Sequence, residues 1–348
     1  MSVLSFKPNI VINNLISGLK DRTKDIMAQR FGFINPERKT LDAIGQKYNI
    51  TRERVRQVIN FALNSIKQSP AIESVQPAFS ELKDVIGKKG WILSERELLD
   101  YLADEPILKN HIFFLLELGD DFARFKEDDD FYHRWTVDEE GADGVHQALK
   151  RLHQEIKEDR VLSEKEIISL LRADAEDFIQ SASWRKEISD EILRSWLNIS
   201  KIITSNHLGE WGSVFSPLIR PRGMRDLVFL ILKKHGSPMH FSEAAQKISQ
   251  CFSCPAHIAT VHNELIKDGR FVLVGRGIYG LAEWGYKPGT VREVIKDIIK
   301  TNGPLSKEEI VKTVLKKRYI KENTILVGLQ NRQYFRRNKD GKYITNSN

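Results

Sequence analysis

Apolar residues recur at intervals of three and four between residues 40 and 66, the spacing that places them on one face of a helix. The pattern breaks once, near Asn49, and therefore predicts two consecutive helices. Thr40 and Thr51 stand where these helices would begin, and a threonine hydroxyl at that position accepts a hydrogen bond from the first helical turn. Asn49 tolerates the left-handed backbone conformation that ends a helix. Together with helices expected within residues 11–33, the pattern predicts a helix-turn-helix.

The outer face of the second predicted helix carries charged and amide side chains. In a helix-turn-helix, the N-terminal residues of this helix enter the major groove of DNA. Arginine pairs with guanine, glutamine with adenine and glutamate with cytosine, and further arginines hold phosphates. On charge alone, the solvated face of an ordinary surface helix is an equal alternative. The candidate DNA-binding residues are Lys39, Thr51, Arg52, Glu53, Arg54, Arg56 and Gln57.

Three motifs lie in this stretch, namely Arg30-Phe-Gly-Phe33, Thr40-Leu-Asp-Ala-Ile-Gly45 and Thr51-Arg-Glu-Arg-Val-Arg-Gln57. They resemble the R-F-G-L, T-L-E-E-I-G and T-R-E-R-I-R-Q motifs of region 4 of the bacterial sigma-70 family, which recognises the promoter −35 element. The similarity covers about residues 21–67. It implies a DNA-binding role in transcription initiation, association with RNA polymerase and a place at the nucleoid in the bacterial cytoplasm.

By position, the resemblance implies that Arg52, Glu53 and Gln57 read bases. The other two arginines of the motif would lie nearer the DNA backbone. Beyond Gln57 the chain departs from the family, because positions that are basic in sigma factors are occupied here by Phe61 and Asn64. The contacts that sigma factors offer to DNA or activators at those positions are therefore not expected. Because only 20 residues precede the similarity, we also expect that the chain is not a complete sigma factor.

A second pattern, Leu-Ser with a glutamate three positions after the serine, recurs along the rest of the chain. It is the signature of a capping box, which opens a helix, and it stands at Ser94, Ser163 and Ser306, with a weaker copy at Ser242. In each copy an amphipathic helix precedes the box.

In the two C-terminal copies a further helix follows the box. After it comes a stretch of alternating apolar and polar residues with a glycine-containing turn, and this stretch predicts a β-hairpin. The order predicts a mainly helical chain in which tandem winged-helix domains with small hairpin wings follow the helix-turn-helix. The predicted domains are residues 1–70, 78–138, 145–215, 222–286 and 288–346.

The two C-terminal copies contain Phe271-Val-Leu-Val-Gly-Arg-Gly-Ile-Tyr-Gly-Leu-Ala-Glu-Trp284 and Leu329-Gln-Asn-Arg-Gln-Tyr-Phe-Arg-Arg337. These segments resemble the HARE-type winged helix of the RNA polymerase delta subunit, of restriction-enzyme fusions and of chromatin regulators. The resemblance covers about residues 223–345. It implies a role associated with DNA or transcription, without a defined catalytic site.

Charge is distributed unevenly along the 348 residues. Residues 1–70 carry 12 basic and 5 acidic side chains, residues 71–215 carry 18 and 31, and residues 216–348 carry 24 and 11. Polyanion binding is therefore expected at the two ends, while the acidic middle would act as a spacer or bind protein. In the C-terminal part, phosphate contact is the favoured role of the basic residues, and docking of protein is the alternative. The candidate DNA-binding residues there are Arg276, Arg332, Arg336, Arg337 and Lys339.

The sequence offers little that points to catalysis or ligand chemistry. Cys251 and Cys254 supply two ligands where a zinc site needs four. The acidic run Glu127–Asp130 is better explained as a solvated hairpin turn than as a metal site, because it lacks the spacing of a calcium-binding loop. We therefore expect a non-enzyme with no catalytic residues, metal, cofactor or small-molecule ligand. Two cysteines, no signal-like run and no long apolar segment predict a cytoplasmic protein without membrane contact.

These patterns together predict a sigma-like DNA-binding transcription regulator. It would read a −35-type element of double-stranded DNA through the major groove and associate with RNA polymerase. One alternative is an accessory protein that docks on polymerase without reading bases. Another is the DNA-recognition subunit of a restriction or modification system, whose catalytic chain would be separate.

Overall fold

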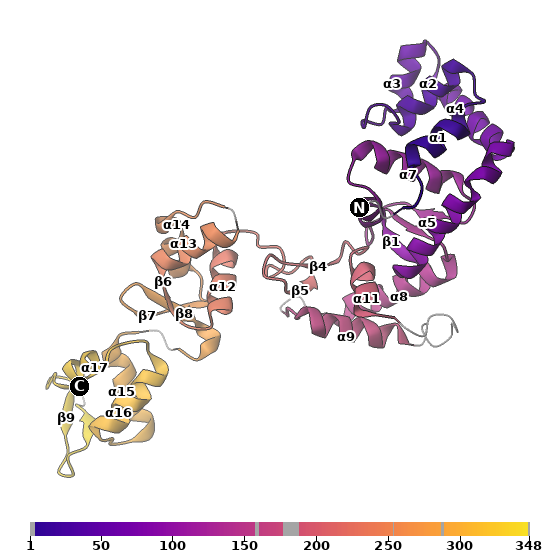
Figure 1. Ribbon diagram of the computed structural model, residues 1–348. Helices are drawn as coiled ribbons and strands as arrows, with labels where there is room; N and C mark the ends of the chain where they lie inside the picture. Colours follow the sequence, from indigo (N-terminus) through magenta and orange to yellow (C-terminus); the bar gives the residue numbers. More distant parts are fainter. Residues whose placement is uncertain (1–3, 157–159, 177–187, 253, 287–288, 347–348) are drawn as a thin grey trace. The chain divides into compact units, whose positions relative to one another are not determined.

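The computed structural model describes residues 4–156, 160–176, 188–252, 254–286 and 289–346. The chain forms two compact units, residues 1–215 and 216–348, coloured indigo to magenta and orange to yellow in Figure 1. In the described residues of both units, short helices predominate and the strands form small antiparallel sheets. The expected mainly helical fold is therefore confirmed.

The N-terminal helices pack around a continuous apolar core. Ile12, Ile26, Ile44 and Val55, one from each helix, are fully buried. The 16-residue helix α4 lies against α3 and α2, and α3 meets it through the predicted turn. The helices are α1 (Pro8–Ile16), α2 (Asp21–Phe31), α3 (Leu41–Tyr48) and α4 (Arg52–Lys67).

The turn between α3 and α4 has the expected chemistry. The Thr40 hydroxyl accepts a hydrogen bond from the Ala43 amide at 3.2 Å, and the Thr51 hydroxyl accepts one from the Arg54 amide at 3.1 Å. Asn49 adopts a left-handed conformation with φ of 53°. Gly45 is needed for a different reason, because a Cβ there would lie 2.6 Å from the Ile50 carbonyl oxygen. The sequence predictions for this corner are confirmed.

The segment that follows, residues 70–136, alternates helices and strands. Its strands form one antiparallel sheet in the order β1-β3-β2. The segment begins with a 3-10 helix at Pro70–Val75, whose Val75 is buried, and α5 follows directly. The elements are η1 (Pro70–Val75), α5 (Gln76–Lys88), β1 (Ile92–Ser94), α6 (Glu95–Leu102), α7 (Pro106–Leu118), β2 (Ala123–Phe125) and β3 (Arg134–Thr136).

Residues 139–215 complete the first unit. A bridge between Leu162 and Trp211 joins the segment before α9 to the hairpin formed by β4 and β5. Trp196 is fully buried and its indole nitrogen donates to the Gly90 carbonyl at 2.9 Å, which ties this segment to the preceding one. The described elements are α8 (Glu139–Glu155), α9 (Glu164–Asp174), α11 (Asp190–Leu197), β4 (Ile203–Ser205) and β5 (Trp211–Ser213).

The second unit contains two segments with a similar succession of elements. In the first segment the sheet has the order β6-β8-β7, and the expected hairpin turns at Arg276 and Gly277. In the second segment, β9 pairs with β10, and a bridge joins Leu305 to Tyr343. The first segment comprises α12 (Met224–His235), β6 (Met239–His240), α13 (Phe241–Cys251), α14 (Ile258–Lys267), β7 (Phe271–Gly275), β8 (Ile278–Leu281) and η2 (Ala282–Trp284). The second comprises α15 (Val291–Asn302), α16 (Lys307–Lys317), α17 (Glu322–Leu329), β9 (Phe335–Arg337) and β10 (Tyr343–Thr345).

The predicted capping boxes are confirmed in part. Ser163 and Ser306 each make the reciprocal bonds of a complete box. Ser94 caps α6, but the Glu97 carboxylate accepts hydrogen bonds from Ser195 and Asn198 of the next segment. The prediction of a weaker capping box at Ser242 is wrong. His240 is the N-cap residue of α13, and its ring accepts a hydrogen bond from the Ser242 amide. The His240 ring nitrogen thus accepts a hydrogen bond from the first turn, the role that the prediction gave to the Ser242 hydroxyl.

Candidate nucleic-acid interface

The polar face of α4 is exposed along its first two turns, as the sequence predicts for a DNA-reading helix. Arg52, Glu53, Arg54, Arg56 and Gln57 are all exposed, while Val55 and Ile59 on the opposite face are buried. Thr51 is exposed and serves as the N-cap residue. The side chains that the sequence assigns to base reading are therefore presented together at the N-terminal end of α4.

Four of these side chains pair with one another on the helix surface, whereas Arg52 pairs with Asp42 of α3 at 3.8 Å. Arg56 donates to both carboxylate oxygens of Glu53, at 2.7 and 2.9 Å, and Arg54 donates to the Gln57 amide oxygen at 3.2 Å. The hydrogen bond from Arg56 holds the pKa of the Glu53 carboxyl below its ordinary value, so this group stays an ionised acceptor at neutral pH. Exposed pairs of this kind are weak, and DNA can displace them at little cost.

Lys39 is exposed in the loop between α2 and α3. Its backbone is held at two points, since its amide donates to the Gln29 carbonyl at 2.9 Å and its carbonyl accepts from Arg30 at 3.2 Å. Arg38, the residue before it, has a structural role. Its guanidinium lies 3.8 Å from the centroid of the Phe113 ring and donates to the Asn110 side-chain oxygen at 2.6 Å, and its burial lowers the pKa of the guanidinium.

Helix α7 holds the helix-turn-helix against the next segment. The Phe114 ring contacts the rings of Phe31 and Phe33 edge-on, at centroid distances of 4.9 and 5.1 Å. The Asn110 amide donates to the carbonyls of Gly32 and Pro36, at 3.1 and 2.9 Å. The side chains of α7 from Asn110 to Leu116 are buried. This stretch of α7 is therefore a packing element and cannot enter a DNA groove in this conformation.

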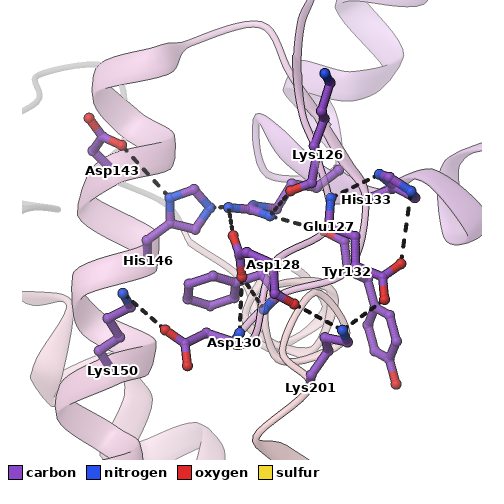
Figure 2. Close-up of polar contacts among 12 residues, drawn as sticks. Lys126, Glu127, Asp128, Asp130, Tyr132, His133, Asp143, His146, Lys150 and Lys201 are labelled. Atoms are coloured by element: carbon purple, nitrogen blue, oxygen red, sulfur yellow. Dashed lines mark hydrogen bonds and ion pairs between the residues drawn. The ribbon is translucent and has the colours of Figure 1, made fainter.

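The acidic loop between β2 and β3 connects two segments of the first unit, as Figure 2 shows. Asp130 pairs with Lys150 of α8 at 3.0 Å, and Glu127 pairs with Lys201 at 2.7 Å. A backbone hydrogen bond also joins the two segments, since the Lys201 amide donates to the Asp130 carbonyl at 2.7 Å. The loop is a solvated turn, as the sequence predicts, since Glu127, Asp128 and Asp129 are exposed. The sequence did not show that lysines of the neighbouring segment pair with its carboxylates.

A buried arginine fixes the same loop from within. Arg134 is 4% exposed and pairs with Asp128 at 3.0 Å, and its Nε donates to the His146 ring at 2.7 Å. Burial, followed by the Arg134 charge, lowers the pKa of His146 from 6.5 to about 4. His146 is therefore a neutral acceptor at physiological pH.

The candidate residues of the C-terminal part lie on the hairpins and beside them. Arg276 is exposed at the turn between β7 and β8, and Arg332, Arg336 and Lys339 are exposed around the β9–β10 hairpin. Arg337 donates to the Tyr343 hydroxyl at 2.8 Å, and its guanidinium lies 4.9 Å from the centroid of that ring. All five belong to the second compact unit, whereas the α4 residues belong to the first.

Two further features of the described residues concern metal binding and membrane insertion. Within the described residues, no group of three or more His, Cys, Asp or Glu side chains is arranged to hold a metal ion, and both cysteines are free thiols. Among the helices of the part of the chain that the structure describes, none is both long and apolar enough to cross a membrane.

Comparison with known proteins supports the assignment of the N-terminal segment. Residues 15–68 match the family model for sigma-70, region 4, which confirms the resemblance of this part of the chain. The RNA polymerase principal sigma factor HrdD of Streptomyces griseus is 36% identical over 67 residues, which are 19% of this chain and 20% of that protein. The RNA polymerase sigma factor SigA of Microcystis aeruginosa is 38% identical over 56 residues, which are 16% of this chain and 14% of that protein. The chain thus spans a fifth or less of the length of these relatives.

Proposed function

We propose that this protein is a sigma-like DNA-binding transcription regulator that reads a −35-type promoter element through the major groove. The observation that carries the proposal is the match of residues 15–68 to sigma-70 region 4, combined with the exposed α4 face. Arg52, Glu53 and Gln57 would read bases, because arginine, glutamate and glutamine complement guanine, cytosine and adenine. Arg54, Arg56 and Lys39 would hold phosphates and set the register of the helix.

We propose that the rest of the chain consists of tandem winged-helix domains, of which the last two are of the HARE type. The order of elements supports this architecture. In residues 76–136 and 224–281 it is helix, strand, helix, helix and hairpin, with the first strand paired to the second strand of the hairpin. In residues 291–345 the bridge between Leu305 and Tyr343 takes the place of the first strand.

The basic hairpins of the second unit would add affinity that does not depend on base sequence. Arg276, Arg332, Arg336 and Lys339 are exposed, and clustered basic side chains bind the phosphate backbone by releasing counterions. The first unit would contribute differently. Its acidic loop is held by ion pairs, and most side chains of helix α7 are buried. This favours a scaffold that holds the α4 face in position and argues against a second DNA-binding surface in this unit.

RNA polymerase is the protein partner we propose, since the matched relatives are RNA polymerase sigma factors. The chain would act by binding and not as an enzyme. The second candidate function is an accessory protein that docks on polymerase without base reading. In that role the pairs of Arg56 with Glu53 and of Arg54 with Gln57 would stay intact, whereas base reading requires them to exchange partners at a small cost.

Fluorescence anisotropy on short duplexes tests the proposal. One duplex carries a −35-type element and the other a scrambled version, each at several salt concentrations. The double variant Arg52→Ala/Gln57→Ala should lose the preference for the element, because a good base contact discriminates by about 1–3 kcal/mol. Arg96→Ala/Gln147→Ala removes the same residue types from exposed positions elsewhere in the first unit and should change nothing. Equal binding of the wild type to both duplexes would leave the accessory role as the better explanation.

A further inference from the structure

We propose that the third turn of α4, together with the residue that follows it, Asn64, reads an A·T base pair, with the Phe61 ring against the thymine methyl group and the Asn64 amide on adenine. The proposal rests on the proposed function, because it requires α4 to lie in the major groove. It assigns a base-reading role to two positions at which the chain departs from the sigma family, and it names the base pair they would recognise.

Phe61 is exposed to an unusual degree for an aromatic side chain. Its exposed fraction is 74%, whereas phenylalanine is among the residues most often buried. The turn on which it lies is well anchored, since Ile59, Ala62 and Ile66 on the opposite face are buried. The Phe61 ring is therefore exposed on a well-packed turn of the helix and not at a frayed helix end.

The neighbours of Phe61 on the helix surface belong to the same outer face. Residues three and four positions apart are adjacent on a helix, so Phe61 adjoins Gln57 and Asn64. Both are exposed, as is Asn60. Four residues correspond to about 6 Å along the helix axis, on the order of two base-pair steps beyond the base contacted by Gln57. A helix that places Gln57 against a base edge therefore brings Phe61 and Asn64 to pairs close by.

The chemistry of this turn differs from that of the first two turns. Residues 58–66 carry no charged side chain, whereas residues 52–57 carry three arginines and a glutamate. Phosphate neutralisation is therefore excluded as the role of the third turn. An asparagine amide and an aromatic ring match what an A·T pair offers in the major groove, namely the N6 and N7 atoms of adenine and the C5-methyl of thymine.

Protein docking is the competing explanation for an exposed aromatic ring, and the surroundings of Phe61 argue against it. Docking surfaces are contiguous apolar patches. In the described part of the first unit, the other large apolar side chains that are exposed, such as Ile10, Ile34 and Tyr132, lie on other elements, and Phe61 is the one on α4. Its neighbours Gln57 and Asn64 are amides, which suit base edges.

The experiment compares a duplex carrying a −35-type element with the same duplex in which every thymine is replaced by deoxyuridine, which removes only the methyl groups. Binding of the wild type, Phe61→Ala, Gln57→Ala and Ile10→Ala is measured by fluorescence anisotropy at several salt concentrations. Ile10 is exposed on α1 of the same unit, so Ile10→Ala controls for loss of an exposed apolar side chain. Thermal unfolding of each variant confirms that the fold is retained.

We expect deoxyuridine to weaken binding of the wild type, Gln57→Ala and Ile10→Ala about fourfold, the equivalent of about 0.8 kcal/mol for one buried methyl group. Phe61→Ala should bind both duplexes equally, with the salt dependence of the wild type, because no phosphate contact is lost. A further set of duplexes replaces single A·T pairs by G·C. Asn64→Ala should lose the preference for A·T at one position of the element, and deoxyuridine at that same position should weaken binding of the wild type.

Two results would overturn the inference and can be told apart. If Gln57→Ala loses the preference for the element while Phe61→Ala keeps the thymine-to-deoxyuridine ratio of the wild type, α4 reads DNA but its third turn does not. If the wild type binds the element and a scrambled duplex equally, the proposed base reading fails, and the role of Phe61 fails with it.

Discussion

The side-chain amide of Asn110 donates a hydrogen bond to the backbone carbonyl of Gly32 at 3.1 Å, although 77 residues separate them in the chain. The same amide donates to the Pro36 carbonyl, and its oxygen accepts from Arg38 at 2.6 Å. One buried side chain of α7 thus holds both ends of the loop that leads into the helix-turn-helix. This loop leads into α3 and α4, so the α4 face that we propose as DNA-reading is linked to the segment that follows it.

Replacing Asn110 by alanine should destabilise the first unit by about 2–4 kcal/mol, because two backbone carbonyls and the Arg38 guanidinium lose a buried partner. Urea unfolding followed by circular dichroism measures the loss. Asn13→Ala, at an exposed position on α1, is the matched control and should change the free energy of unfolding by less than about 0.5 kcal/mol. Equal stability of the two variants would show that the loop is held by its apolar contacts alone.

Gly32 should be more sensitive to substitution than Gly18 of the same unit. Its φ of 72° is left-handed, and a Cβ would meet the Asn110 amide nitrogen. Gly32→Ala should therefore cost about 1–3 kcal/mol from backbone strain, with a further loss from the displaced amide. Gly18 has open space around it and serves as the control for a change from glycine to alanine. Thermal unfolding measures the loss of stability in each variant. A smaller loss for Gly32→Ala than for Gly18→Ala contradicts this explanation.

The local structure around α3 and α4 could be predicted from the sequence because its determinants are local. Thr40, Asn49 and Thr51 each act within a few residues of their own position, and the three-and-four spacing of apolar residues defines the buried face. The hairpin at Arg276 was predictable for the same reason, since its turn requires a glycine with positive φ at Gly277.

The packing of the middle of the chain could not be predicted in this way, because it depends on partners far apart in sequence. The carboxylates of Glu127 and Asp130 belong to a solvated turn, as expected, but the sequence does not show that Lys201 and Lys150 pair with them. Glu97 has the position of a capping-box residue, yet Ser195 and Asn198 take its carboxylate. One signal was present in the sequence, since residues 112–116 are apolar without interruption, which is typical of a helix buried on all sides.

The His146 ring should make the first unit sensitive to acid. Its pKa in the folded protein is about 4, below the ordinary value of 6.5, so the unfolded chain takes up this proton first as the pH falls. The stability contributed by neutral His146 is therefore complete above about pH 6.5 and is lost as the pH falls toward 4, by on the order of 3 kcal/mol in total. Carboxylates that titrate near pH 4 add their own dependence, so the comparison is made between variants.

His146→Gln tests this assignment, because glutamine can still accept the hydrogen bond from Arg134 but does not titrate. Urea midpoints measured between pH 4.5 and 7.5 should fall less steeply with acid for this variant than for the wild type. His235→Gln, at an exposed position in the second unit, should retain the wild-type slope. Parallel curves for His146→Gln and the wild type would assign the acid sensitivity to other groups.

The basic hairpin of the last segment should contribute affinity without sequence preference. In Arg332→Ala/Arg336→Ala/Lys339→Ala, three exposed cations are removed, and binding to promoter and scrambled duplexes should weaken equally. Each lost phosphate contact lowers the slope of log K against log salt by about one, so the triple variant should lose about three. The slope is measured by anisotropy titrations at several salt concentrations.

The control variant Lys300→Ala/Lys312→Ala/Lys316→Ala removes the same positive charge from the helices of the same segment. It separates a local contact of the hairpin from a general effect of charge. If both triple variants lose the same slope, the affinity comes from the net charge of the second unit and the hairpin has no special part in it.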